Sequence, residues 1–127
     1  MKVGVNVAVN SNTGDVGAFA KKAEDLGFQS IWMAEHPIMP VHTTSKYGGT
    51  PDGSIPPAMS DMADPFISLA IASGTTSKIK LGTSICLIPE HNPLVQAKQI
   101  AALDYHSGGR FIFGIGTGWL REETEIM

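Results

Sequence analysis

Four short apolar runs alternate along the chain with segments whose apolar residues recur at helical spacing. The runs predict strands over residues 3–9, 28–34, 79–88 and 111–115. The helical spacing predicts helices over residues 15–26, 64–74 and 93–106, and residues 120–127 look like the opening of a fourth helix. Near-continuous apolar strands are typical of a parallel sheet covered by helices.

The helix starts carry their own signals. Asp15 and Asn92 can cap the helices that follow them, and Pro65 and Pro93 suit a first helical position. Residues 37–63, in contrast, show no periodicity. A loop of about 27 residues is unusual in a compact domain and is usually functional or disordered. Its side chains His42, Tyr47, Met39, Met59 and Met62 form either an apolar lid over a substrate or part of a disordered segment.

Two architectures fit four consecutive β-α units: a doubly wound sheet, or half of a (β/α)8 barrel. A full barrel typically needs ~250 residues, and this chain has 127 and ends inside a predicted helix. We therefore expect residues 1–127 to be a single α/β unit that belongs to a truncated barrel, with a complete small domain as the alternative.

The composition of the chain argues against several classes of binding partner. The net charge of −3 gives no electrostatic case for nucleic acid or a membrane surface. No apolar stretch is long enough to span a bilayer, and the N-terminus does not resemble a signal peptide. The single cysteine, Cys86, lies in an apolar run and is expected to be a buried thiol in a cytoplasmic protein. The four scattered histidines show no metal-binding spacing, so no metal site is expected.

Polar and glycine-rich clusters follow three of the predicted strands: Glu35-His36, Thr83-Ser84-Ile85 and Gly116-Thr117-Gly118. Ligands bind at this end of parallel strands, so the clusters predict a small-molecule site. His36 can exchange a proton near neutral pH, or it is an ordinary loop histidine. The glycines allow close approach to a flat ring, or they ease packing of a strand on a helix. Their GxGxG spacing is a poor match to a dinucleotide fingerprint.

Four segments resemble the luciferase-like flavin and deazaflavin oxidoreductases, which include the bacterial luciferase subunits and dehydrogenases that use coenzyme F-420. They read GFQSIWMAEH (27–36), DPFISLAIASGTTSKIKLGTSI (64–85), NPLVQAKQIAALD (92–104) and SGGRFIFGIGTGW (107–119). The resemblance implies a (β/α)8 barrel, of which this chain holds the first four units. The likeness is strongest to the deazaflavin branch, through LGTSI and GIGTGW.

The resemblance also implies roles for single residues. His36 becomes the main catalytic candidate, and Glu35 its orienter or a contact of the cofactor ring. Residues Thr83, Ser84, Ile85, Gly116, Thr117 and Gly118 become the cofactor-binding set, with a cis peptide bond between Ser84 and Ile85 behind the ring. Trp119 stands where sugar-phosphate dehydrogenases of the family carry an acidic residue, and Pro40 where they carry a tryptophan, which argues against sugar phosphates as substrates.

The predicted function is therefore hydride transfer between a reduced cofactor and a small organic substrate. Coenzyme F-420 (a deazaflavin) is the preferred cofactor and FMN the alternative. Two alternative hypotheses remain: an FMN-dependent monooxygenase, and a non-catalytic half-barrel that only oligomerises. In the family, the helices that match residues 64–74 and 93–106 form a dimer interface, so we expect a homodimer through them.

Overall fold

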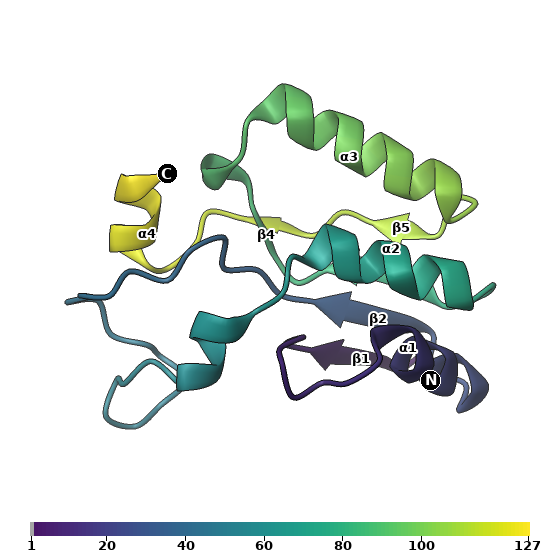
Figure 1. Ribbon diagram of the computed structural model, residues 1–127, viewed down its shortest axis with the longest axis horizontal. Helices are drawn as coiled ribbons and strands as arrows, with labels where there is room; N and C mark the ends of the chain where they lie inside the picture. Colours follow the sequence, from purple (N-terminus) through teal and green to yellow (C-terminus); the bar gives the residue numbers. More distant parts are fainter. Residues whose placement is uncertain (1) are drawn as a thin grey trace.

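A four-stranded parallel sheet forms the centre of the structure, a computed structural model that describes residues 2–127 (Figure 1). Its order is β1-β2-β3-β5, and the strands are β1 (Gly4–Val7), β2 (Ser30–Met33), β3 (Lys80–Thr83) and β5 (Phe111–Ile112). A second parallel pair joins β4 (Cys86–Leu87) to β6 (Ile115–Gly116). The predicted parallel α/β class is confirmed.

The helices begin where the capping residues predict. They are α1 (Val16–Asp25), α2 (Pro65–Thr75), α3 (Pro93–His106) and α4 (Arg121–Ile126), with short 3-10 turns η1 (Pro57–Asp61) and η2 (Ile88–Glu90). The side chains of Asp15, Asp64 and Asn92 each accept hydrogen bonds from backbone N–H groups in the first turn that follows. None of the helices within residues 2–127 is long and apolar enough to cross a membrane.

Strand order distinguishes the two architectures that the sequence left open. Each strand of the main sheet pairs with the next one along the chain, in register from Gly4↔Ser30 to Leu81↔Phe111. Helices α1, α2 and α3 lie together on one side of it (Figure 1). A doubly wound sheet instead reverses its strand order and carries helices on both faces. The arrangement is therefore that of consecutive β-α units of a barrel wall.

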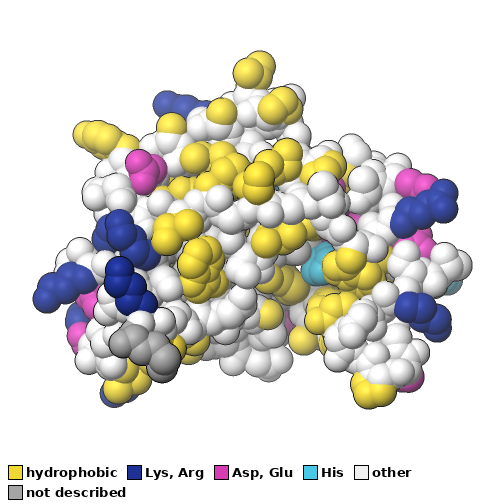
Figure 2. All heavy atoms as spheres, turned by 180° about the vertical axis from the view of Figure 1, so that it is seen from behind, with side chains coloured by type: hydrophobic (Ala, Val, Ile, Leu, Met, Phe, Trp, Pro, Cys, Tyr) yellow, Lys and Arg dark blue, Asp and Glu magenta, His cyan; other side chains and the backbone are white. Residues whose placement is uncertain are grey.

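The two faces of the sheet differ in what covers them. Ile31, Met33 and Leu81 are almost fully buried in a core that also contains Ala20 of α1 and Leu69 of α2. On the other face the indole of Trp32 lies across Gly82, where any Cβ would collide with the ring. Seen from behind (Figure 2), the molecule shows hydrophobic side chains over its middle.

Two of the predicted strands are interrupted. The apolar run over residues 79–88 predicts one continuous strand, but pairing stops after Thr83 and resumes at Cys86. The peptide bond between Ser84 and Ile85, which lies in this interruption, is cis, as the family resemblance implies. The run over residues 111–115 is likewise divided between β5 and β6 around Gly114.

A partly exposed brace at the opposite end of the sheet ties α1 to the turn before β3. The Glu24 carboxylate accepts hydrogen bonds from the N–H groups of Ser77, Lys78 and Ile79, at 2.9, 2.6 and 2.9 Å. Partial burial works against its ionisation, but the hydrogen bonds from Ile79, Lys78 and Ser77 outweigh burial and lower the pKa of Glu24 from 4.5 to about 2.

We predict that Glu24→Gln lowers the free energy of unfolding by roughly 1–2 kcal/mol at pH 7, allowing for partial exposure of the group. Because the pKa of Glu24 is lower in the folded chain, the stabilisation is complete above about pH 4.5 and disappears as the pH falls toward 2. Urea unfolding from pH 7 to pH 2.5 should show the two proteins converging. Glu125→Gln, in an exposed pair with Arg121, is the control and should show no such gap.

Candidate functional site

A cleft of about 420 Å³ opens at the carboxyl ends of the strands, where the sequence predicts the site. The residues that line it come from the end of β2, the cis peptide region, the loop after β6 and the long loop. They are Ala34, Glu35, His36, Tyr47, Met59, Ser84, Ile85, Leu87, Thr117, Gly118 and Trp119. The volume falls within the range of small-molecule sites.

The structure brings six of the eight predicted site residues into this lining: Glu35, His36, Ser84, Ile85, Thr117 and Gly118. Thr83 and Gly116 are not among them. Thr83 is fully buried, and its hydroxyl bonds both the carbonyl and the N–H of Gly114, at 2.7 and 3.0 Å. Thr83 therefore supports the cleft from behind instead of lining it.

His36 has a carboxylate partner that the sequence did not predict. Its Nδ1 lies 2.7 Å from Oε2 of Glu123 in α4, and the two side chains are 7% and 1% exposed. Trp119 meets the imidazole edge-on, with the ring centroids 5.8 Å apart. The expectation that Glu35 orients His36 is thus wrong, because Glu123 occupies that position.

Glu35 instead braces the wall behind the cleft. One carboxylate oxygen accepts the N–H of Leu87 at 2.7 Å, and the other lies 2.9 Å from Nε2 of His91. The buried thiol of Cys86 is close by and accepts a hydrogen bond from Gln96. Burial, and then the neighbouring Glu35 carboxylate, raise the pKa of Cys86 to about 12, so this thiol stays protonated.

Glu35, Cys86 and His91 also form a group of metal-ligating side chains, with ligand atoms all within 4.8 Å of one another. The spacing of histidines in the sequence could not reveal such a group, because its members come from three separate segments. In the structure Glu35 takes its hydrogen bonds from His91 and from the Leu87 backbone, so the group as it stands fixes β2 against β4 and the turn before α3.

The long loop, residues 37–63, lines part of the cleft. This agrees with the hypothesis of a lid and not with that of a disordered segment. Tyr47 and Met59 line the cleft, and the Tyr47 ring packs against Trp119 with centroids 5.2 Å apart. Glu122 of α4 anchors the loop at Thr44. Its carboxylate accepts hydrogen bonds from the N–H and the hydroxyl of Thr44, at 2.6 and 2.8 Å. These hydrogen bonds hold the pKa of Glu122 well below its usual range.

A third glutamate lies buried beneath the cleft. Glu90 is 4% exposed, and its Oε1 accepts the hydroxyl of Thr124 at 3.0 Å. Its other oxygen is buried without a partner among residues 2–127. Burial raises the pKa of Glu90, despite the hydrogen bond from Thr124, and the nearby Glu123 raises it further.

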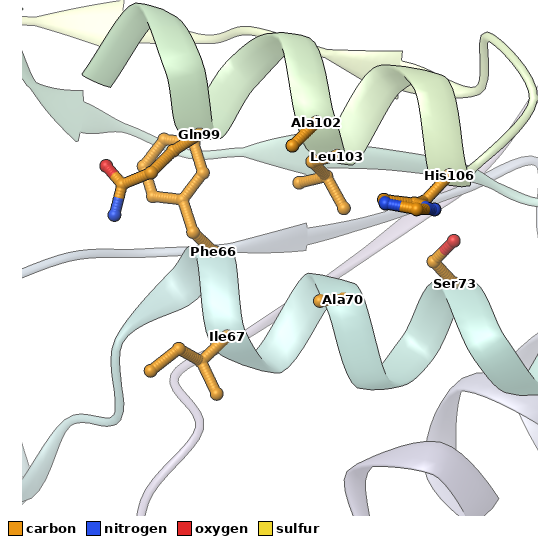
Figure 3. Close-up of a pocket in the computed structure, with 8 residues that line it drawn as sticks. All are labelled: Phe66, Ile67, Ala70, Ser73, Gln99, Ala102, Leu103 and His106. Atoms are coloured by element: carbon orange, nitrogen blue, oxygen red, sulfur yellow. The ribbon is translucent and has the colours of Figure 1, made fainter. Parts of the chain in front are cut away.

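A more apolar hollow, of about 400 Å³, lies away from this chemistry, between α2 and α3 (Figure 3). Its lining includes Phe66, Ile67 and Ala70 of α2 together with Ala102 and Leu103 of α3. The hollow contains no acidic group, and His106 at the end of α3 is its one titratable side chain. The cleft beside His36 is therefore the candidate ligand site.

Comparison with known proteins identifies the family of the chain. The sequence profile of the luciferase-like monooxygenase family matches residues 1–127. An uncharacterised protein of Mycobacterium tuberculosis is 40% identical over 107 residues, which are 84% of this chain and 38% of that protein. The F-420-dependent glucose-6-phosphate dehydrogenase of Kineococcus radiotolerans is 34% identical over 115 residues, 89% of this chain and 29% of that enzyme.

Among solved structures, the oxygenating constituent of 3,6-diketocamphane monooxygenase of Pseudomonas putida, in complex with FMN, superposes with a TM-score of 0.74. At 20% identity it shows the fold alone; it covers 99% of this chain, which in turn covers 32% of that structure. The fold thus defines a parallel α/β protein with the strand order of a barrel wall. The chain belongs to the luciferase-like monooxygenase family, and it spans 38% of the length of the mycobacterial relative.

We predict that Gly114→Ala damages the support of the cleft. A Cβ there would overlap the carbonyl oxygen of Thr83, which is backbone and cannot move aside cheaply. We expect a loss of roughly 1–3 kcal/mol in the free energy of unfolding, from overpacking. Gly74→Ala is the matched control, because its Cβ would meet nothing within 4 Å and alanine favours the helix by up to ~1 kcal/mol. Equal midpoints in urea for the two variants would contradict the prediction.

Proposed function

We propose that the cleft beside His36 binds the flat ring of a flavin or deazaflavin and that the protein acts as an oxidoreductase on a small organic substrate. The observation that carries this proposal is the convergence of an imidazole, a cis peptide and a glycine-containing loop on one cleft at the carboxyl ends of parallel strands. Family membership and the two cofactors named among the relatives support it.

The residues of the cleft fit a flat, mostly apolar ring. Ile85, Leu87, Met59 and Trp119 give the cleft apolar lining. Ser84 and Thr117 provide hydroxyl groups that can bond polar atoms on a ring edge. Such a ring, when bound, would supply the hydride chemistry, while the protein would orient the substrate and exclude water. His36 would then hold or accept a proton at the edge of the ring.

No lysine or arginine lines the cleft within residues 2–127. Recognition by this part of the protein would therefore depend on the ring and not on a phosphate group. We keep coenzyme F-420 as the preferred cofactor, on the sequence likeness of LGTSI and GIGTGW, and FMN as the alternative, which would favour monooxygenation.

The test is titration of the protein with FMN, riboflavin and coenzyme F-420, followed by ring fluorescence. We expect saturable binding of at least one ring, with riboflavin and FMN within about tenfold of each other, since no cationic side chain selects the phosphate. Ala34→Leu should fill the cleft and abolish binding. Ala102→Leu makes the same change in the separate hollow of Figure 3 and should preserve it. If the wild-type protein binds none of these rings, the result would favour the alternative hypothesis, a non-catalytic half-barrel that only oligomerises.

We also propose a homodimer formed through α2 and α3. Ile67 and Ile71 of α2 are 65% and 47% exposed, and Leu94 and Val95 of α3 are 82% and 57% exposed. These exposed side chains, and the apolar hollow between the two helices (Figure 3), offer apolar area that a second copy could cover.

Sedimentation of Ile67→Asp and Leu94→Asp variants tests the dimer, because a buried charge without a partner opposes association. We expect each variant to shift the protein from dimer to monomer at micromolar concentration. Val41→Asp is the control, since Val41 is 92% exposed on the long loop, and it should sediment as wild type. A wild-type monomer would refute the proposal.

A further inference from the structure

The contact between His36 and Glu123 restricts which nitrogen of the imidazole can carry the proton. Nδ1 of His36 and Oε2 of Glu123 are 2.7 Å apart, and both side chains are more than nine-tenths buried. The other carboxylate oxygen of Glu123 faces the backbone N–H of Ile38 at 3.3 Å. A buried carboxylate needs hydrogen-bond donors, and these two groups supply them.

The position of the imidazole proton follows from these bonds. A neutral imidazole carries one N–H, and the partner of each nitrogen decides where it resides. An ionised Glu123 can only accept, so the proton must lie on Nδ1. Nε2 has no hydrogen-bond partner among residues 2–127 and is left as an acceptor, and His36 is one of the residues that line the cleft.

Glu123 is itself held firmly by its neighbours in the sequence. Glu122 bonds Thr44 of the long loop, and the hydroxyl of Thr124 bonds Glu90 beneath the cleft. Three consecutive side chains of α4 thus contact three different segments around the site. The edge-on contact of Trp119 restrains the imidazole from another side.

We infer that Glu123 is a positioning residue that fixes the tautomer of His36, so that Nε2 acts as a hydrogen-bond and proton acceptor toward the cleft. In catalysis this inference rests on the proposed function, because His36 must then serve the reaction. The tautomer itself is a property of the protein alone. It can therefore be measured without any cofactor or substrate.

The test is Glu123→Gln. A carboxamide can satisfy both neighbours only if its oxygen accepts from the Ile38 N–H and its NH₂ donates to Nδ1. Nδ1 must then be unprotonated, and the proton moves to Nε2. Imidazole ¹⁵N chemical shifts should therefore show the Nδ1–H form in wild type and the Nε2–H form in Glu123→Gln, at a pH where His36 is neutral.

Two further variants separate positioning from general damage. Glu123→Asp keeps a carboxylate and should retain the Nδ1–H form. Glu122→Gln changes the adjacent residue of the same helix, which contacts Thr44 and not His36, and should also retain it. A wild-type protein with the proton on Nε2, or an unchanged tautomer in Glu123→Gln, would overturn the inference.

Turnover provides the second readout. In protein that binds a ring, Glu123→Gln should lower kcat by roughly 10²-fold, the low end of general acid–base catalysis, with a much smaller change in KM. If no variant binds a ring, the proposed function fails, while the tautomer measurement still decides the role of Glu123. A reversed tautomer with unchanged kcat in protein that turns over would refute the positioning role.

Discussion

The need to supply hydrogen-bond donors to the buried carboxylate of Glu35 determines how the chain is arranged at the carboxyl ends of the strands. A charge in this position must be supplied with donors, and it obtains them from the Leu87 backbone and the His91 ring. These bonds fix the end of β2 against β4 and against the turn that leads into α3. His36, the next residue in the chain, and Leu87, a wall of the cleft, take their positions from this arrangement.

Three further glutamates belong to the same region of the molecule. Glu123 holds the imidazole, Glu122 holds the long loop, and Glu90 lies underneath with one oxygen unpaired. Acidic groups gathered in a poorly hydrated region raise the free energy of each further negative charge. Hydrogen-bond donors offset that cost, and Glu35, Glu122 and Glu123 each contact at least two of them.

Much of the fold could be predicted because its signals are local. Asp15, Pro65 and Asn92 fixed the helix starts within a residue or so, through capping and proline geometry. The interruption at Ser84 and Ile85 left no trace in the apolar pattern, because every neighbouring residue suits a strand, and only the family likeness indicated it. The barrel order of the strands likewise required the resemblance, since four β-α units fit either architecture.

The site was predictable only in part, for the same reason. Glu35, His36 and Thr117 follow strands, so topology alone brings them together. Glu123 lies 87 residues from His36 in the sequence, in a short acidic helix whose composition suggests an exposed surface. The role given to Glu35 failed because adjacency in the sequence was taken for contact. Beyond Met33, where β2 ends, Glu35 bonds Leu87 and His91, while His36 contacts Glu123.

The two tryptophans of the chain occupy sharply different surroundings. Trp32 lies flat on Gly82 in the sheet, and Trp119 stands in the wall of the cleft between His36 and Tyr47. Their indole emission consequently reports two separate events, integrity of the sheet and occupancy of the cleft. A chain carrying phenylalanine in place of Trp32 would become its own optical sensor for whatever enters beside the imidazole.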